Sequence, residues 1–268
     1  MEVMARTWTF PLRCRLFLLL AFTITIPLVN TARAQVRVLH QEGSLHGFLA
    51  LRSLEGEVLA SGDLIQAVHG NRVTSHLVFH FKDGSLHEET AVYNQSREFR
   101  LLSYHLVQKG PSFPRTLDLH ADIPKGTVTV QYTDKDHPQQ VKSEHMDLPA
   151  NLANGLTATL FKNIPAQGSE TKLSMIVATP KPRLVTLAIA SQGEDSFSIA
   201  GSKRKATHFV AKLELGGVAG VVAPLVGKKP PDIHVWVSSG DGPAFLRSEN
   251  QLFADGPVWR IELTSPVW

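Results

Sequence analysis

The sequence is poor in cysteine. Its one cysteine, Cys14, lies close to the N-terminus. The chain that follows therefore has no disulfide, no cysteine-based metal site and no cysteine nucleophile. The hydrophobic core alone has to stabilise the fold. Cys14 also lies well upstream of the cleavage position predicted below, so we expect no lipid anchor on the mature chain.

The N-terminal segment has an apolar run that is short for a membrane span. Leu16–Val29 falls below the roughly 20 residues that a transmembrane helix needs. Arg13 and Arg15 precede this run, and Ala32 and Ala34 follow it. A basic start, an apolar stretch and two small residues are the three parts of a secretory signal peptide. We expect cleavage after Ala34 and export to the periplasm or the extracellular space, which N-terminal sequencing of the exported protein tests.

The chain has no excess of one charge once this segment is removed. Four of the 27 basic residues and one of the 24 acidic residues lie in residues 1–34, which leaves 23 of each in residues 35–268. Proteins that bind nucleic acids carry a concentrated positive field. We therefore expect no nucleic-acid partner. The length of residues 35–268 fits a single β-rich domain.

Motifs of several catalytic sites are missing. The sequence has no Gly-x-Ser-x-Gly elbow for a serine nucleophile. Gly216-Gly217 is not followed by the Lys-Ser/Thr of a phosphate-binding loop. The carboxylates are scattered singly, without the paired acid and base of a glycosidase. We predict no catalytic residue and no cofactor, and an enzyme of unrecognised type stays open as an alternative because active sites on β folds often leave no local motif.

Alternation of apolar and polar residues dominates the rest of the chain, and this pattern is typical of strands with one buried face. Turn residues separate the alternating stretches at intervals of about 8 to 14 residues. The stretches are 72–82, 116–123, 128–132, 173–177, 184–190, 197–199, 207–215, 233–237 and 258–263. The sequence therefore predicts an all-β fold, a strongly curved antiparallel sheet (a half-barrel or barrel-like meander) with one or two short helices.

Asp83-Gly84 gives the best short-range hairpin signal, because this dipeptide favours a two-residue turn between antiparallel strands. We predict that residues 72–82 pair with residues 85–93 across it. Leu77, Phe79 and Phe81 would then face the core.

The same register places His80 opposite His87, with Glu89 diagonal to His80 on one face. Two imidazoles and a carboxylate are suitable ligands for zinc. The alternative is the solvated polar face of an amphipathic hairpin. We favour the polar face and expect no functional metal.

One interruption of the strand pattern falls at Pro149–Ile164. Leu152, Leu156 and Leu160 recur there at intervals of four, between Pro149 and Pro165. This spacing predicts a short helix with one apolar stripe. We expect the stripe to plug one side of the sheet.

A second interruption, Gly216–Gly227, is apolar all round and is followed by Lys228 and Lys229. It is either a buried hairpin end or short helix, or an exposed lid that contacts a ligand or an anionic membrane surface. Val222→Asp would destabilise the fold severely if the segment is buried, whereas in a lid the same substitution would only weaken binding to lipid. The residues that we expect to form the lid are Val218, Val221, Val222, Leu225 and Val226.

Three C-terminal segments carry a family resemblance: residues 232–237, 242–249 and 256–263. They resemble a group of exported bacterial β-rich proteins of unknown function, which are similar in turn to the periplasmic lipoprotein-localisation carriers. The resemblance implies an incomplete barrel whose open side is closed by short helices. It implies no catalytic residue.

These observations favour a periplasmic protein that binds or carries a lipid, a lipid-modified protein or another apolar ligand without catalysis, with peripheral membrane contact as a further expectation. The physical reason is that a curved sheet with apolar inward residues leaves a cavity unless helices fill it. The first alternative is an envelope scaffold with a filled core that binds another protein. The second is an enzyme, which a polar cluster inside the cavity would favour.

Overall fold

The computed structural model describes residue 2 and residues 35–133, 140–199, 202–214, 230–240 and 242–264. All of its helices and strands lie in one compact unit, Arg33–Trp268. The strands of its first half are β1 (Leu45–Arg52), β2 (Val58–His69), β3 (Arg72–Phe81), β4 (Leu86–Gln95), β5 (Phe99–Lys109), β6 (Thr116–Asp122), β7 (Thr127–Thr133) and β8 (Gln140–His145). The helix α1 (Thr157–Phe161) follows, and then β9 (Thr171–Val177), β10 (Arg183–Ile199), β11 (Ser202–Glu214), β12 (Ile233–Ser238), β13 (Phe245–Gln251) and β14 (Val258–Thr264).

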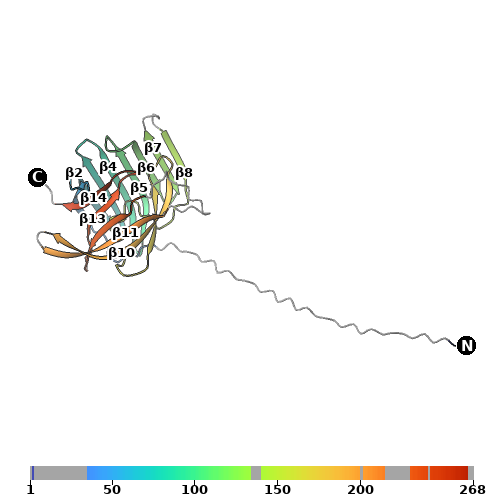
Figure 1. The fold of residues 1–268 in the computed structure, drawn as a ribbon. Coiled ribbons are helices and arrows are strands. Elements are labelled where there is room, and N and C mark those ends of the chain that lie inside the picture. The colour runs from blue at the N-terminus through green and yellow to red at the C-terminus, as the bar shows by residue number, and fades with distance from the viewer. Residues whose placement is uncertain are drawn as a thin grey trace. The chain divides into compact units, whose positions relative to one another are not determined.

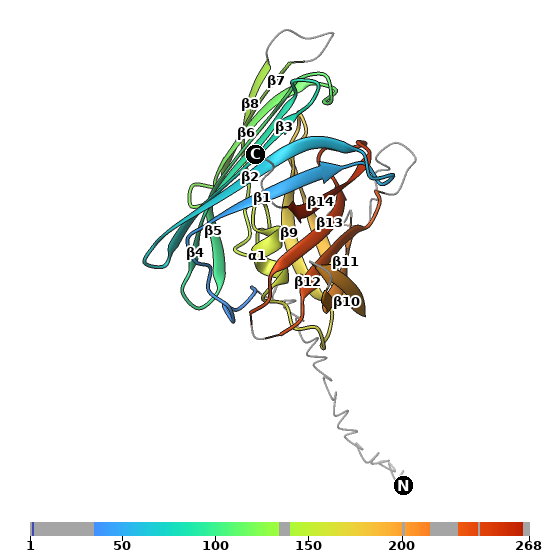
Figure 2. The same cartoon turned by 90° about the vertical axis from the view of Figure 1, so that its left-hand side faces the viewer.

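The strands form one 14-stranded sheet whose order is β8-β7-β6-β5-β4-β3-β2-β1-β14-β13-β12-β11-β10-β9. The described pairings are antiparallel, and β1 joins the two halves by pairing with β14. Its two edges, β8 and β9, are not paired with each other. The sheet therefore curves without closing, as Figures 1 and 2 show. The predicted all-β fold with a curved antiparallel sheet is confirmed.

The β3–β4 hairpin differs from the prediction by one residue. Its loop consists of Lys82, Asp83 and Gly84, because the Phe81 amide donates to the Ser85 carbonyl oxygen at 3.0 Å. Gly84 has φ +82°. A three-residue hairpin of this kind ends on a residue in the left-handed region, which glycine adopts without strain.

The shifted register turns the side chains of β4 to the face of the sheet opposite to the predicted one. His80 lies opposite Leu86, and Phe79 lies opposite His87. The predicted pairing of His80 with His87 is therefore wrong, since a one-residue slip turns each side chain to the other face of the sheet. His80 is exposed, whereas His87 is 1% exposed and points inward.

The inward face of β3 agrees with the sequence prediction. Phe79 is fully buried, Phe81 is buried and Leu77 packs partly buried beside them. Phe79 lies opposite Gly62 of β2, where the absence of a side chain leaves room for the ring. The core therefore depends on a small residue facing a large one across two neighbouring strands.

The segment between β8 and β9 plugs the open side of the sheet. The predicted apolar stripe is confirmed as core, since Leu152, Leu156 and Leu160 are all buried. They join a cluster that draws on strands from both halves of the sheet. Figure 2 shows α1 between β4 and β5 on one side and β12 on the other.

The helix is shorter than Pro149–Ile164, the predicted range, because residues 151–154 run along the edge of β9 instead. Leu152 forms a parallel bridge with Ser174. The side chain of Asn154 accepts from the Ile176 amide at 2.8 Å and donates to the Ile176 carbonyl at 2.9 Å. These bonds satisfy the backbone of an edge strand and require an extended chain, so the helix begins only after them.

Gly155 lets this plug segment approach β4 closely. Its φ is +68°, and a Cβ built on it would lie 2.6 Å from Cβ of Ala91 and 3.3 Å from the Tyr104 ring. Both the backbone conformation and the contact therefore require glycine at this position.

Candidate ligand-binding cavity

The inner face of the sheet surrounds two adjoining cavities. The large cavity has a volume of about 320 Å³ and the small cavity about 180 Å³. They meet at a common set of residues from β4, the plug segment, β12 and β13. The residues that line both are Glu89, Gly155, Thr157, Ile233, Asn250 and Leu252.

The large cavity has a mostly apolar wall that both halves of the sheet contribute. Leu49 of β1 is buried and Leu263 of β14 lies opposite it in the sheet. Leu263 and Leu45 are 47% and 39% exposed, so they lie where the cavity meets solvent. The remaining apolar lining residues are Leu64, Leu77, Ala91, Ala158, Ile233, Pro243, Ala244, Phe245, Leu252 and Ile261.

Gly47 leaves part of this wall open. A Cβ built there would lie 3.7 Å from Leu45 and 4.0 Å from Leu64, which are ordinary van der Waals distances. A larger side chain at Gly47 would therefore extend into the cavity without disturbing the strand.

Glu89 is the acidic residue at the junction of the cavities, and its setting is defined by hydrogen bonds. His87 Nε2 lies 3.0 Å from Glu89 Oε1. On the other side of the ring, Gln108 Nε2 lies 3.0 Å from His87 Nδ1 and 2.7 Å from the carbonyl oxygen of Leu252. Because a carbonyl only accepts, the Gln108 atom facing it must be the amide nitrogen, which also donates to His87 Nδ1. The His87 proton is therefore on Nε2 and is donated to Glu89.

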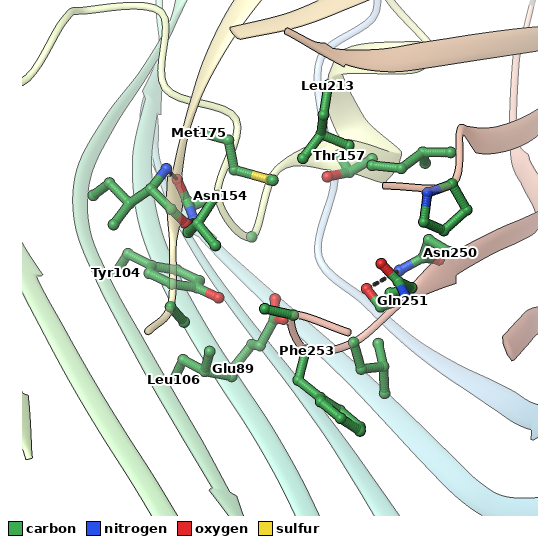
Figure 3. Close-up of a pocket in the computed structure, with 18 residues that line it drawn as sticks. Glu89, Tyr104, Leu106, Asn154, Thr157, Met175, Leu213, Asn250, Gln251 and Phe253 are labelled. Atoms are coloured by element: carbon green, nitrogen blue, oxygen red, sulfur yellow. Dashed lines mark hydrogen bonds between the residues drawn. The ribbon is translucent and has the colours of Figure 1, made fainter. Parts of the chain in front are cut away.

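Tyr104 is the second neighbour of Glu89. Burial raises the pKa of Tyr104 well above its usual value, and the charge of Glu89 and a hydrogen bond to it add to this effect. The hydroxyl therefore stays protonated and donates to Glu89. Figure 3 shows the Tyr104 hydroxyl pointing toward the Glu89 carboxylate inside the small cavity.

Lys162 is the basic residue of the large cavity, and its charge is matched. Its ammonium lies 2.6 Å from Oε1 of Glu42, and both side chains are largely buried. Gln66 also donates to Glu42 at 3.2 Å. The charges of Lys162 and Glu42 are therefore paired with each other at the edge of the large cavity.

The predicted lid residues, Val218, Val221, Val222, Leu225 and Val226, lie outside the described residues, so their role stays a prediction. The described residues on either side of that segment include Leu213 and Pro231, and both line the small cavity. Met175, Gln251 and Phe253 line it as well, as Figure 3 shows.

The sequence suggests His87 and Glu89 as possible zinc ligands beside His80, on a face that the structure shows to be the wrong one. The two-residue turn predicts that they share a solvated face with His80, whereas in the structure they line the large cavity and His80 is on the other face. The signal that identifies their true face is the alternation toward the end of β4, where Ala91 and Tyr93 are both buried. Counting back from these two residues by twos places Glu89 and His87 inside.

Two further findings concern the described residues alone. They contain no group of three or more His, Cys, Asp or Glu side chains placed to hold a metal ion. None of the helices within them is long and apolar enough to cross a membrane.

The fold and its cavities define a β-rich protein with an incompletely closed barrel and an internal pocket of mixed polarity. No protein-family model matches the sequence, and no curated protein matches it. A crystal structure from Brucella abortus, described as a β-barrel-like protein of the domain of unknown function DUF1849, is similar, with a TM-score of 0.44 and 8% sequence identity. The similarity covers 83% of this chain and 97% of that one. This likeness assigns no activity to the chain.

Proposed function

We propose that this protein is exported and binds, without catalysis, a lipid or another ligand with a long apolar part in the large cavity. The observation that carries the proposal is the apolar wall that β1 and β14 build around about 320 Å³, with Leu45 and Leu263 exposed at its rim. Pockets that hold small molecules have volumes of about 300 to 1,000 Å³ and are mostly apolar.

The energetics support an apolar occupant. Each methylene group transferred from water into such a cavity contributes about 0.8 kcal/mol. A chain of several methylene groups therefore gains several kcal/mol. This proposal also agrees with the resemblance to periplasmic lipoprotein-localisation carriers, and export rests on the N-terminal segment of the sequence.

Blocking the cavity tests the proposal. Gly47→Leu places a side chain in the large cavity, where the Cβ meets only ordinary contacts. Gly43→Leu is the matched control, because a Cβ at Gly43 meets nothing within 4 Å and Gly43 does not line either cavity. Binding of an environment-sensitive apolar dye is titrated by fluorescence for both variants and the wild type.

We expect Gly47→Leu to weaken dye binding at least tenfold and Gly43→Leu to leave it unchanged, with both melting temperatures close to the wild type. Native mass spectrometry of protein purified from its own compartment should also show a bound lipid. If the wild-type protein binds neither dye nor lipid, the proposal is wrong and the envelope scaffold that binds another protein becomes the favoured hypothesis.

A further inference from the structure

The carboxylate of Glu89 has no cationic neighbour among the described residues, and this distinguishes it from Glu42, the acidic partner of the cavity residue Lys162. Its described partners are His87 and Tyr104, which are both neutral donors. Glu42, by contrast, is paired with Lys162. The described partners of Glu89 therefore bring no positive charge to the junction of the two cavities, and a cationic group of a ligand would be the first counter-charge there.

Two aromatic side chains line the small cavity together with this carboxylate. Tyr104 and Phe253 both line it together with Glu89, and Figure 3 shows Glu89 near both of them. The faces of aromatic rings attract cations, most strongly where water is displaced. A carboxylate beside two aromatic rings is a suitable setting for an ammonium group.

The two cavities differ in a way that matches the two ends of one molecule. The large cavity has the long apolar wall, and the small cavity has Glu89 with its aromatic neighbours. Glu89 lines both, so a single ligand that spans the junction contacts the carboxylate with its head and the leucines with its chain.

We propose that the ligand is an amphipathic ammonium compound, whose cationic head is recognised by Glu89, Tyr104 and Phe253 and whose apolar chain occupies the large cavity. This inference rests on the proposed function, since it names the class of ligand for the same pocket. The desolvated ion pair with Glu89 provides the preference for a cation over a neutral or anionic head.

Three probes with the same chain and different heads test the inference: decylammonium, 1-decanol and decanoate, each measured below its micelle concentration by displacement of the apolar dye. We expect decylammonium to bind the wild type at least tenfold more tightly than decanol, and decanoate to bind most weakly. If none of the probes binds, the proposed function fails. If decanol binds as tightly as decylammonium, or decanoate binds best, the pocket binds apolar chains and the inference about the head is wrong.

Glu89→Gln removes the charge and keeps the size of the side chain. We expect it to weaken decylammonium binding at least tenfold and to leave decanol binding within twofold. Glu88→Gln is the control, because Glu88 lies on the same strand, on the other face, where it binds His76 at 2.7 Å. Equal weakening of all probes by Glu89→Gln would assign Glu89 a structural role and overturn the inference. The comparison of probes on the wild type holds even if the variant fails to fold.

Discussion

The ring of Phe79 occupies the space that a side chain at Gly62 would need: a Cβ built on Gly62 would lie 2.4 Å from Cε1 of Phe79. The two residues are direct partners in the β2–β3 pairing. Phe79 is fully buried beside the apolar wall of the large cavity. The size of the side chain at either position therefore limits the size of the side chain at the other.

Phe79→Ala should lower the free energy of unfolding by about 3 to 5 kcal/mol, the range for truncation of a buried phenylalanine. Gly62→Ala should cost about 1 to 3 kcal/mol, because the new methyl group overlaps the ring. In the double variant the cost of Gly62→Ala should fall below about 1 kcal/mol, since the ring is gone. Urea denaturation of the four proteins gives the coupling, and additive costs would show that the two residues do not compete for space.

Gly155→Ala should destabilise the protein by about 2 to 4 kcal/mol, because it combines a left-handed backbone with an overlap against Ala91. Gly70→Ala is the matched control, with φ +58° and nothing within 4 Å of the new Cβ. It should cost only about 1 to 2 kcal/mol for the backbone. Equal costs in thermal or urea denaturation would mean that the plug segment tolerates a wider spacing from β4.

An aromatic stack on the other face of the sheet gives a pH-dependent prediction. The rings of His208 and Trp236 are parallel within 8° at 4.4 Å, and Arg247 lies 4.0 Å from the Trp236 ring. Burial lowers the pKa of His208, and the positive charge of Arg247 and the neighbouring His234 add to this. Asp195 and Glu249 face the same imidazole and act in the opposite direction.

Because the pKa of His208 is lower in the folded state, the unfolded state binds the proton more readily. Neutral His208 therefore contributes fully to the free energy of unfolding above its ordinary pKa of about 6.5. This contribution is lost as the pH falls through the lower pKa that His208 has in the folded state. Urea denaturation at pH 5 and pH 8 should show a smaller acid-induced loss of stability for His208→Gln than for the wild type. His69→Gln, at an exposed end of β2, should behave like the wild type.

Asn154→Ala should cost about 1 to 3 kcal/mol, since it leaves the amide and carbonyl of Ile176 without their side-chain partners in a buried position. Asn154→Asp keeps the acceptor and loses the donor, so it should be destabilising as well and should place a charge near a carbonyl oxygen. Hydrogen exchange at Ile176 reports this directly. An unchanged exchange rate in Asn154→Ala would mean that β9 is protected by other contacts.

The fold class was predictable from the sequence because alternation and turn residues are local signals, and β3 and the leucines of the plug segment illustrate this. The register of β3 with β4 was not, because Asp83-Gly84 is compatible with loops of two or three residues. The one extra loop residue is what turns His87 toward the cavity, whereas His80 faces outward in either register. The proposed ligand pocket was equally hidden, since Glu89, Tyr104 and Phe253 are brought together from β4, β5 and the β13–β14 loop only by the curvature of the sheet.

The pairing of β1 with β14 has a consequence for how the protein folds. Every other pairing in the sheet joins strands that are consecutive in the chain. Phe48 and Thr264 of the β1–β14 pair, by contrast, are partners although they lie 216 positions apart in the sequence, and contacts of such long range form slowly. Two meanders are therefore expected to assemble first and to meet last. Since the apolar wall takes Leu49 from one meander and Ile261 from the other, the pocket comes into existence only in that final step.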